Sequence, residues 1–251
     1  MANPFCKTEY LMPSNSRFHN EKMLATKHTI SWEAGSIPRS SLFDDTFYSR
    51  QHGQSETAYV FIDGNRLPDR WSSPEHFTIG ELGFGTGLNF LETWRHWIDA
   101  RSPSQQLLFT SFECYPISAD DMARALAAWD TLKPLSQILI SRWQEQPSLP
   151  MHWQIDQQTV LQVDPGKAEQ AVAQWSDMAD AWYLDGFSPA KNPDMWSPAL
   201  MQQVFDHTAE TGSFATYTAA AWVRRNLQAA GFAVSRRKGF AGKREMMFGQ
   251  R

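Results

Sequence analysis

The sequence predicts an α/β fold with a mostly parallel sheet that carries helices on both faces. After residue 74, short apolar runs alternate with longer amphipathic segments, and parallel strands need such helical crossovers between them. The chain has 251 residues, of which 42% are hydrophobic and 20% charged, which is enough for one large core and unlike a disordered protein. Its two cysteines, Cys6 and Cys114, do not suggest a disulfide framework or a zinc site. We therefore expect a single domain over residues 1–251.

Residues 1–70 are expected to form a β-rich N-terminal elaboration, with short strand-like pieces at 29–32 and 59–62, and residues 75–251 to form the core. The expected core strands are 77–82, 107–113, 159–163, 181–185, 213–218, 232–238 and 244–249. The expected helices, where apolar residues recur at helical spacing, are 87–100, 119–129, 167–175, 197–207 and 219–230. Ligands of such sheets bind beyond the carboxyl ends of the strands, so a site is expected in the loops that follow them.

The first of these loops is rich in glycine. Residues 81–89 read Glu-Leu-Gly-Phe-Gly-Thr-Gly-Leu-Asn, a strand end followed by alternating glycines and a helix start. Glycine lets the backbone approach a ligand, and a helix start offers free N–H groups. The spacing fits neither a nicotinamide fingerprint nor a phosphate-binding P-loop, and a turn that binds nothing is the alternative. An acid before the glycines could pair with the ammonium of an amino-acid-bearing cofactor. The candidate residues are Glu81, Gly83, Gly85, Thr86, Gly87 and Asn89.

Three further strand ends carry a carboxylate. Glu113 could accept both hydroxyls of a ribose, or be a solvated strand end. Asp164 could accept an adenine amino group, although Asp-Pro-Gly is also an ordinary turn. Asp185 and the Gly-Phe-Ser-Pro that follows it resemble the Asp-Pro-Pro-Tyr element of amino-group methyltransferases. In that element a carboxylate or carbonyl holds an NH₂ in line with a methyl donor. As an alternative, Asp185 could cap the turn that follows.

Together the four loops resemble the class I S-adenosylmethionine-dependent methyltransferases. The resemblance implies S-adenosyl-L-methionine as cofactor, with the glycine loop at the methionine part, Glu113 at ribose, Asp164 near adenine and Asp185 at the reacting end. It also implies a Rossmann-like, seven-stranded sheet whose last strand, here 244–249, is antiparallel. No metal site is expected.

The charge of the chain is uneven. The formal net charge is −4, yet residues 222–251 contain eight basic residues and a single acid, Glu245. The basic residues are Arg224, Arg225, Arg236, Arg237, Lys238, Lys243, Arg244 and Arg251. Such a distribution can place one positive face on an acidic body, where a polyanion docks, or it can be an ordinary solvated surface.

Four longer segments identify a narrower resemblance. Residues 81–91, 112–116, 184–196 and 238–246, with 43–45 and 56–61 upstream, are similar to the methyltransferase half of the bifunctional tRNA wobble-uridine enzyme MnmC. The resemblance implies methylation of the exocyclic amine of 5-aminomethyl(-2-thio)uridine in tRNA, giving the 5-methylaminomethyl product. The bifunctional enzyme also has an FAD-dependent oxidase domain, for which this chain has no length. We therefore expect a stand-alone methyltransferase of the MnmD type, with another enzyme, such as a separate FAD-dependent oxidase, supplying the aminomethyl precursor.

This setting gives roles to the candidate residues. Asp185 is the expected catalytic residue, which orients the amine and helps accept its proton. Tyr48 and Phe187 could flank a flipped uracil or be core aromatics. Phosphates of the anticodon stem-loop would be bound by Lys191, Arg224, Arg225, Arg236, Arg237, Lys238, Lys243 and Arg244.

Other functions stay open at this point. The acceptor could be a small amine or a protein, the fold could belong to a nicotinamide oxidoreductase, or the chain could be a non-catalytic tRNA-binding module. The sequence has no apolar run of the ~20 residues that span a bilayer, and its first residues lack the pattern of a signal peptide. We therefore expect a cytoplasmic protein without a membrane partner. We also expect a monomer, since no exposed heptad pattern favours assembly.

Overall fold

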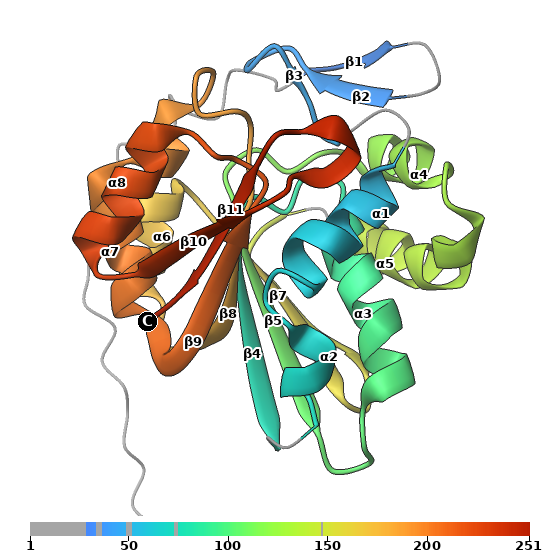
Figure 1. Ribbon diagram of the computed structural model, residues 1–251. Helices are drawn as coiled ribbons and strands as arrows, with labels where there is room; N and C mark the ends of the chain where they lie inside the picture. The colour runs from blue at the N-terminus through green and yellow to red at the C-terminus, as the bar shows by residue number, and fades with distance from the viewer. Residues whose placement is uncertain (1–28, 34–36, 49–51, 73–74, 147) are drawn as a thin grey trace, which may run out of the picture.

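An eight-stranded, mostly parallel sheet forms the centre of the computed structural model (Figure 1). The structure describes residues 29–33, 37–48, 52–72, 75–146 and 148–251. The strand order is β10-β11-β9-β8-β4-β5-β7-β6. The parallel strands at its centre are β4 (His76–Leu82), β5 (Gln106–Glu113), β7 (Thr159–Pro165), β8 (Ala179–Leu184) and β9 (Thr208–Thr216). Chain order reverses at β4, which lies between β5 and β8, so this is the switch point where a ligand of such a sheet binds.

Helices cover both faces of this sheet and form two cores. On one face lie α3 (Leu88–Ala100), α4 (Ala119–Leu126) and α5 (Lys133–Glu145), and on the other lie α6 (Ala168–Gln174), α7 (Pro198–Asp206) and α8 (Ala221–Ala230). Successive side chains of a strand point to opposite faces, so β8 contributes to both cores. Ala181 and Tyr183 pack in the first core, and Trp182 and Leu184 in the second.

Antiparallel strands lie at both edges of the sheet. At one edge, β11 (Met246–Gln250) runs between β9 and β10 (Ala233–Arg237), antiparallel to both. This confirms the antiparallel last strand expected from the methyltransferase resemblance. At the other edge, β6 (Met151–Asp156) pairs antiparallel with β7 and raises the count from the expected seven strands to eight. Sequence analysis missed both β6 and α5, although Met151 and Trp153 of β6 are buried in alternation with exposed neighbours.

The N-terminal segment forms a second, three-stranded antiparallel sheet of β1 (Ile30–Glu33), β2 (Ile37–Ser40) and β3 (Asp45–Thr46). Figure 1 shows this sheet across one end of the central sheet. The short helices that follow are α1 (Gly53–Thr57), the π-helical η1 (Ala58–Ile62) and α2 (Leu67–Arg70).

The prediction of a strand at 59–62 was wrong. Val60, Phe61 and Ile62 are consecutive buried residues of η1 in the first core. A short apolar run of this kind does not distinguish a strand from a buried helix, and here the helix prevails. Among the described residues, no helix has the length and apolar character needed to cross a membrane.

Candidate active site

The carboxyl ends of β4, β5 and β8 open into a cavity of about 410 Å³. The loops after these three strands form its floor, and residues 45–48, 53, 56 and 57 of the N-terminal segment form much of its wall. Tyr217, which follows β9, and Lys243, which precedes β11, complete it. The cavity therefore lies at the switch point of the sheet, where the sequence predicted a site.

The glycine loop after β4 has a left-handed backbone that only glycine adopts readily. The φ angles of Gly83, Gly85 and Gly87 are +85°, +55° and +76°. Gly83 and Gly85 line the cavity, with Thr86 beside them. Gly87 faces the core instead, where a Cβ atom would lie 2.8 Å from Leu139 Cδ2. The three glycines thus differ in place: the first two lie with their backbone at the cavity, and the third leaves room for the Leu139 side chain of α5.

Glu113, at the end of β5, is tied to this loop. Its carboxylate accepts hydrogen bonds from Gly85 N–H at 3.0 Å and Tyr115 N–H at 2.6 Å. Burial raises the pKa of Glu113, while these backbone N–H groups act in the opposite direction. The backbone thus fixes the orientation of the Glu113 carboxylate, and Glu113 lines the cavity.

One amide joins two other carboxylates. Asn89 Nδ2 donates to Glu81 Oε1 at 3.0 Å and to Asp185 Oδ2 at 2.7 Å, and Thr57 Oγ1 donates to Asn89 Oδ1 at 2.7 Å. Gly186 N–H donates to Asp185 Oδ1 at 2.8 Å, which fixes the second carboxylate oxygen. Burial raises the pKa of Asp185 to about 6 and holds the pKa of Glu81 well above its ordinary value. Both groups would be stabilised as anions by a positively charged ligand.

The charges that line the cavity are mostly negative. Among the described lining residues, Asp45, Glu56, Glu113 and Asp185 are acidic and Lys243 is the one basic side chain. Lys243 Nζ lies 2.5 Å from Glu56 Oε1 and 4.9 Å from the centre of the Tyr217 ring. The cavity therefore suits a cationic ligand such as S-adenosyl-L-methionine, which carries a sulfonium and an ammonium.

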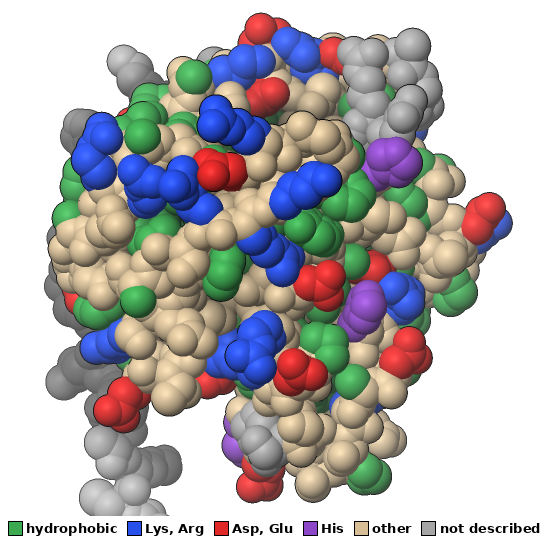
Figure 2. Space-filling model, in the orientation of Figure 1, with side chains coloured by type: hydrophobic (Ala, Val, Ile, Leu, Met, Phe, Trp, Pro, Cys, Tyr) green, Lys and Arg blue, Asp and Glu red, His purple; other side chains and the backbone are tan. Residues whose placement is uncertain are grey.

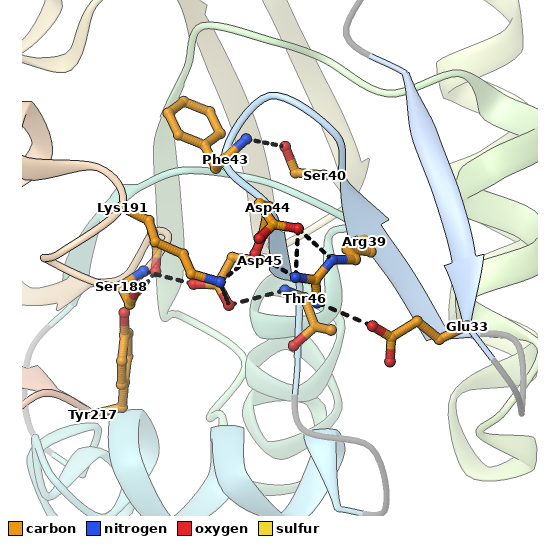
Figure 3. Close-up of polar contacts among 11 residues, drawn as sticks. Glu33, Arg39, Ser40, Phe43, Asp44, Asp45, Thr46, Ser188, Lys191 and Tyr217 are labelled. Carbon is orange, nitrogen blue, oxygen red and sulfur yellow. Dashed lines mark hydrogen bonds and ion pairs between the residues drawn. The ribbon is translucent and has the colours of Figure 1, made fainter.

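A set of polar contacts ties the N-terminal sheet to the loop after β8 (Figure 3). Asp45 Oδ2 accepts Ser188 N–H at 2.9 Å, and Asp45 Oδ1 lies 3.6 Å from Lys191 Nζ. Lys191 also donates to the main-chain oxygen of Asp44, whose carboxylate pairs with Arg39 at 2.6 Å. The loop that carries Asp185 is thus held from above by the segment that walls the cavity.

Aromatic rings reinforce the same junction. The Phe187 ring stacks on Phe43 with centroids 4.7 Å apart and meets the edge of Phe47 at 5.2 Å. Phe187 lines both this cavity and a neighbouring one of about 450 Å³, which also involves Tyr115 and Lys167. The two cavities therefore adjoin at Phe187.

The structure brings most of the predicted cofactor residues together. Gly83, Gly85, Thr86, Asn89, Glu113 and Asp185 line the cavity, and Glu81 lies buried behind Asn89. Asp164 lines neither cavity, and its carboxylate accepts the Gln162 amide at 2.8 Å. After it the chain turns at Gly166, which faces the second cavity, so a contact between Asp164 and adenine stays a prediction.

The residues proposed to bind RNA are more dispersed. Tyr48 lines the cavity, but its hydroxyl donates to Ala125 O and its ring packs on Trp129 at 4.8 Å. Arg237 donates to Tyr59 O and lies 4.3 Å from the centre of that ring. Figure 2 shows basic side chains spread over the face formed by α8, β10 and β11. The exposed basic residues of these elements and their loops include Arg225, Arg236, Lys238 and Arg244, while Arg224 is half-buried.

Sequence reasoning missed Asp45, Glu56 and Tyr217 as parts of the site. Asp45 meets Ser188 across 143 positions of sequence, and Glu56 meets Lys243 across 187. No local sequence pattern indicates a contact between residues so far apart in the chain. The one available signal was the similarity to MnmC at 43–45 and 56–61, which had no role assigned to it.

Comparison with known proteins agrees with this geometry. Residues 130–251 match the family described as S-adenosyl-L-methionine-dependent methyltransferase. The chain is 39% identical over 227 residues to the tRNA 5-methylaminomethyl-2-thiouridine biosynthesis bifunctional protein MnmC of Chromohalobacter salexigens, covering 88% of this chain and 32% of that protein. Identity to the MnmC protein of Aeromonas hydrophila is 42% over 240 residues, covering 88% and 35%. The chain thus spans about a third of the length of these relatives.

Solved structures share the fold. MNMC2 from Aquifex aeolicus matches with a TM-score of 0.72 and 22% identity, covering 88% of this chain and 69% of that one. Spermidine synthase in complex with the transition state analogue AdoDATO matches with a TM-score of 0.50 and 12% identity, covering 88% and 72%. These likenesses show that the central sheet and its helices share the Rossmann-like fold of those structures.

Proposed function

We propose that this chain is an S-adenosyl-L-methionine-dependent methyltransferase related to MnmC and that it methylates an amine of tRNA. The acceptor is the exocyclic amine of 5-aminomethyl(-2-thio)uridine at the wobble position, and the product is 5-methylaminomethyl(-2-thio)uridine. The observation that carries the proposal is the position of Asp185. Its carboxylate lies at the switch point beside the glycine loop, in an acidic cavity bounded by aromatic rings.

The cofactor would be held by residues of β4, β5 and the loops that follow. Gly83, Gly85 and Thr86 would receive its methionine part, with free N–H groups near the start of α3 for the carboxylate. Glu81, through the amide of Asn89, would favour the ammonium. Glu113 would accept the ribose hydroxyls, and the second cavity beyond Phe187 offers room for the adenine. We treat 75–251 as the methyltransferase core and the described part of 1–70 as an elaboration of the same domain.

Asp185 would act on the acceptor amine. A protonated amine has no lone pair for attack, so the site has to remove a proton and orient the nitrogen. A carboxylate with a pKa of about 6 is mostly ionised at neutral pH and can accept that proton directly or through water. Asn89 and Gly186 N–H hold the two carboxylate oxygens in place. When bound, S-adenosyl-L-methionine supplies an electrophilic methyl group on a positively charged sulfur.

The face of α8, β10 and β11 would bind the anticodon stem-loop. Arg225, Lys238 and Arg244 are exposed there, and Lys and Arg side chains at phosphates give binding that weakens as salt rises. Lys191 is already engaged by Asp44 and Asp45, so we propose that it positions the loop over the base as well as attracting RNA. We further propose a cytoplasmic monomer that receives the aminomethyl precursor from another enzyme, such as an FAD-dependent oxidase.

Mass spectrometry of tRNA nucleosides tests the function. The substrate is tRNA from cells that lack this protein, incubated with the purified chain and S-adenosyl-L-methionine. We expect the aminomethyl nucleoside to gain one methyl group, and Asp185→Asn to lose turnover by ~10²-fold or more while it still binds the cofactor in calorimetry. Methylation of small amines but not of tRNA would favour the alternative acceptor class. Full turnover by Asp185→Asn would refute the role of Asp185.

A further inference from the structure

Glu56 and Lys243 form an ion pair in the wall of the cavity, although they come from opposite ends of the chain. Glu56 belongs to α1, and Lys243 follows the 3₁₀ turn η4 (Phe240–Gly242). The Lys243 Nζ to Glu56 Oε1 distance is 2.5 Å, and the exposed fractions of the two side chains are 45% and 13%. The carboxylate is therefore largely withdrawn from water, and the ammonium covers it from the open side.

The backbone before Lys243 holds it in this place. Ala241 and Gly242 have left-handed φ angles of 46° and 86°, which an alanine rarely adopts. Lys243 N–H donates to Phe240 O at 3.0 Å and closes the turn. The Lys243 ammonium then lies over the Tyr217 ring, a favourable position for a cation. Tyr217 in turn donates its hydroxyl to Gly186 O at 2.9 Å, next to Asp185 in sequence.

This pair acts on Asp185 through charge. The ionisable groups that face Asp185 are Glu56 from α1, Lys243 from the turn before β11, Glu81 from β4 and Tyr217 from the segment after β9. Asn89 of α3 is its neutral partner. Asp45 and Glu113 line the same cavity, and Lys191 pairs with Asp45. The Glu56 charge raises the pKa of Asp185 and the Lys243 charge lowers it. The two opposing charges lie together, so their effects offset one another at this site.

We propose that Glu56 and Lys243 are positioning residues that act as a neutral pair, so that the acceptor amine meets Asp185 as its carboxylate partner. An unpaired Glu56 would attract the amine as an ammonium and would stabilise that unreactive form. With Lys243 on Glu56, the amine gives its proton to Asp185 and keeps its lone pair. This inference rests on the proposed function, because it assigns the pair to the amine-acceptor side of the same site.

The sign of the effect differs between the two single variants. Lys243→Met leaves Glu56 unpaired, which raises the pKa values of both Asp185 and the bound amine. The acidic limb of the pH profile of kcat/KM for tRNA should move to higher pH by roughly half a pH unit or more. Glu56→Gln leaves Lys243 unpaired and should move the limb to lower pH. The double variant removes both charges and should return the limb close to that of the parent chain.

A matched control is Lys133→Met, which removes one exposed lysine from the first position of α5. It should leave the limb in place. Melting curves establish that all variants are folded. The proposal would be overturned if the acidic limb moved in the same direction in both single variants or did not move in either. It would also be overturned if the double variant did not restore the limb.

A second readout does not depend on activity. The carboxyl carbon of Asp185 can be followed by ¹³C nuclear magnetic resonance in the full chain without tRNA, with Asp185→Asn used for assignment. We expect its titration to move up in Lys243→Met, down in Glu56→Gln and back in the double variant. If these shifts occur but tRNA is not methylated, the pair stands and the proposed function fails. If tRNA is methylated and Asp185 titrates alike in all variants, the function stands and the pair fails.

Discussion

Asp185 should make the protein less stable while making it active. Its pKa rises from 3.8 to about 6 in the folded chain because the carboxylate is buried. Each pKa unit corresponds to about 1.4 kcal/mol, so above pH 6 the ionised group costs the fold up to about 3 kcal/mol. Asp185→Asn removes that cost. The amide, however, can accept a hydrogen bond from only one of Asn89 and Gly186 N–H, and the lost hydrogen bond reduces the gain by about 1 kcal/mol. We expect a net gain of about 1 to 2 kcal/mol, or ~2 to 8 °C in Tm, together with loss of turnover.

The pH dependence gives this prediction its sign. The folded state binds the Asp185 proton more tightly than the unfolded chain, so the cost is absent below pH 4, grows between pH 4 and 6, and is complete above that range. Melting curves of the parent and Asp185→Asn at pH 4, 6 and 8 measure it. Asp164→Asn, at a carboxylate outside both cavities, is the control and should show no gain at pH 8. A gain that is the same at all three pH values, or no gain at pH 8, would refute the reasoning.

Three further substitutions test other parts of the site. Gly85→Ala places a Cβ 3.3 Å from Phe47 Cδ1 at a φ of +55°, so we expect a loss of about 1 to 2 kcal/mol in stability and weaker cofactor binding, measured by denaturant unfolding and calorimetry. Arg225→Ala should weaken tRNA binding and reduce its salt slope by about 1, with cofactor affinity unchanged; an unchanged slope would remove Arg225 from the RNA surface. Asp45→Ala removes the acceptor of Ser188 N–H and one of the two partners of Lys191, so kcat should fall more than cofactor affinity does. Equal kcat in the parent and variant would show that this contact does not position the loop.

The central sheet could be predicted because its strands have a strong local pattern. The buried run of β8 and the glycines after β4 mark strand, loop and helix in a few residues each. Residues 59–62 are also apolar but belong to the helix η1, because an apolar run that packs in the first core can be a helix as well as a strand. The edge strand β6 is additional to the seven strands expected from the methyltransferase resemblance, so the resemblance did not predict it.

The site residues, like the strands, could be predicted only where a local sequence pattern marks them. Glu113 and Asp185 could be found because each follows a strand, and parallel strands bring their ends to one edge. Glu56 and Lys243 could not be paired in this way, because their meeting depends on how α1 and the turn before β11 pack across the sheet. Lys243 also shows how a charge count can mislead. It belongs to the basic end of the chain, yet its ammonium points to a carboxylate of the cavity instead of standing free for a phosphate.

The amide of Asn89 links the two halves of the proposed reaction. Both of its N–H donors are in use, one at Glu81 on the cofactor side and one at Asp185 on the acceptor side. A cation seated near Glu81 stabilises the ionised forms of both carboxylates, and lowers the affinity of Asp185 for a proton. If the cofactor binds as proposed, with its ammonium near Glu81, it should move Asp185 toward its carboxylate form. The same burial that raises the pKa of Asp185 and costs stability in the free chain would make the proposed base respond to a cationic ligand.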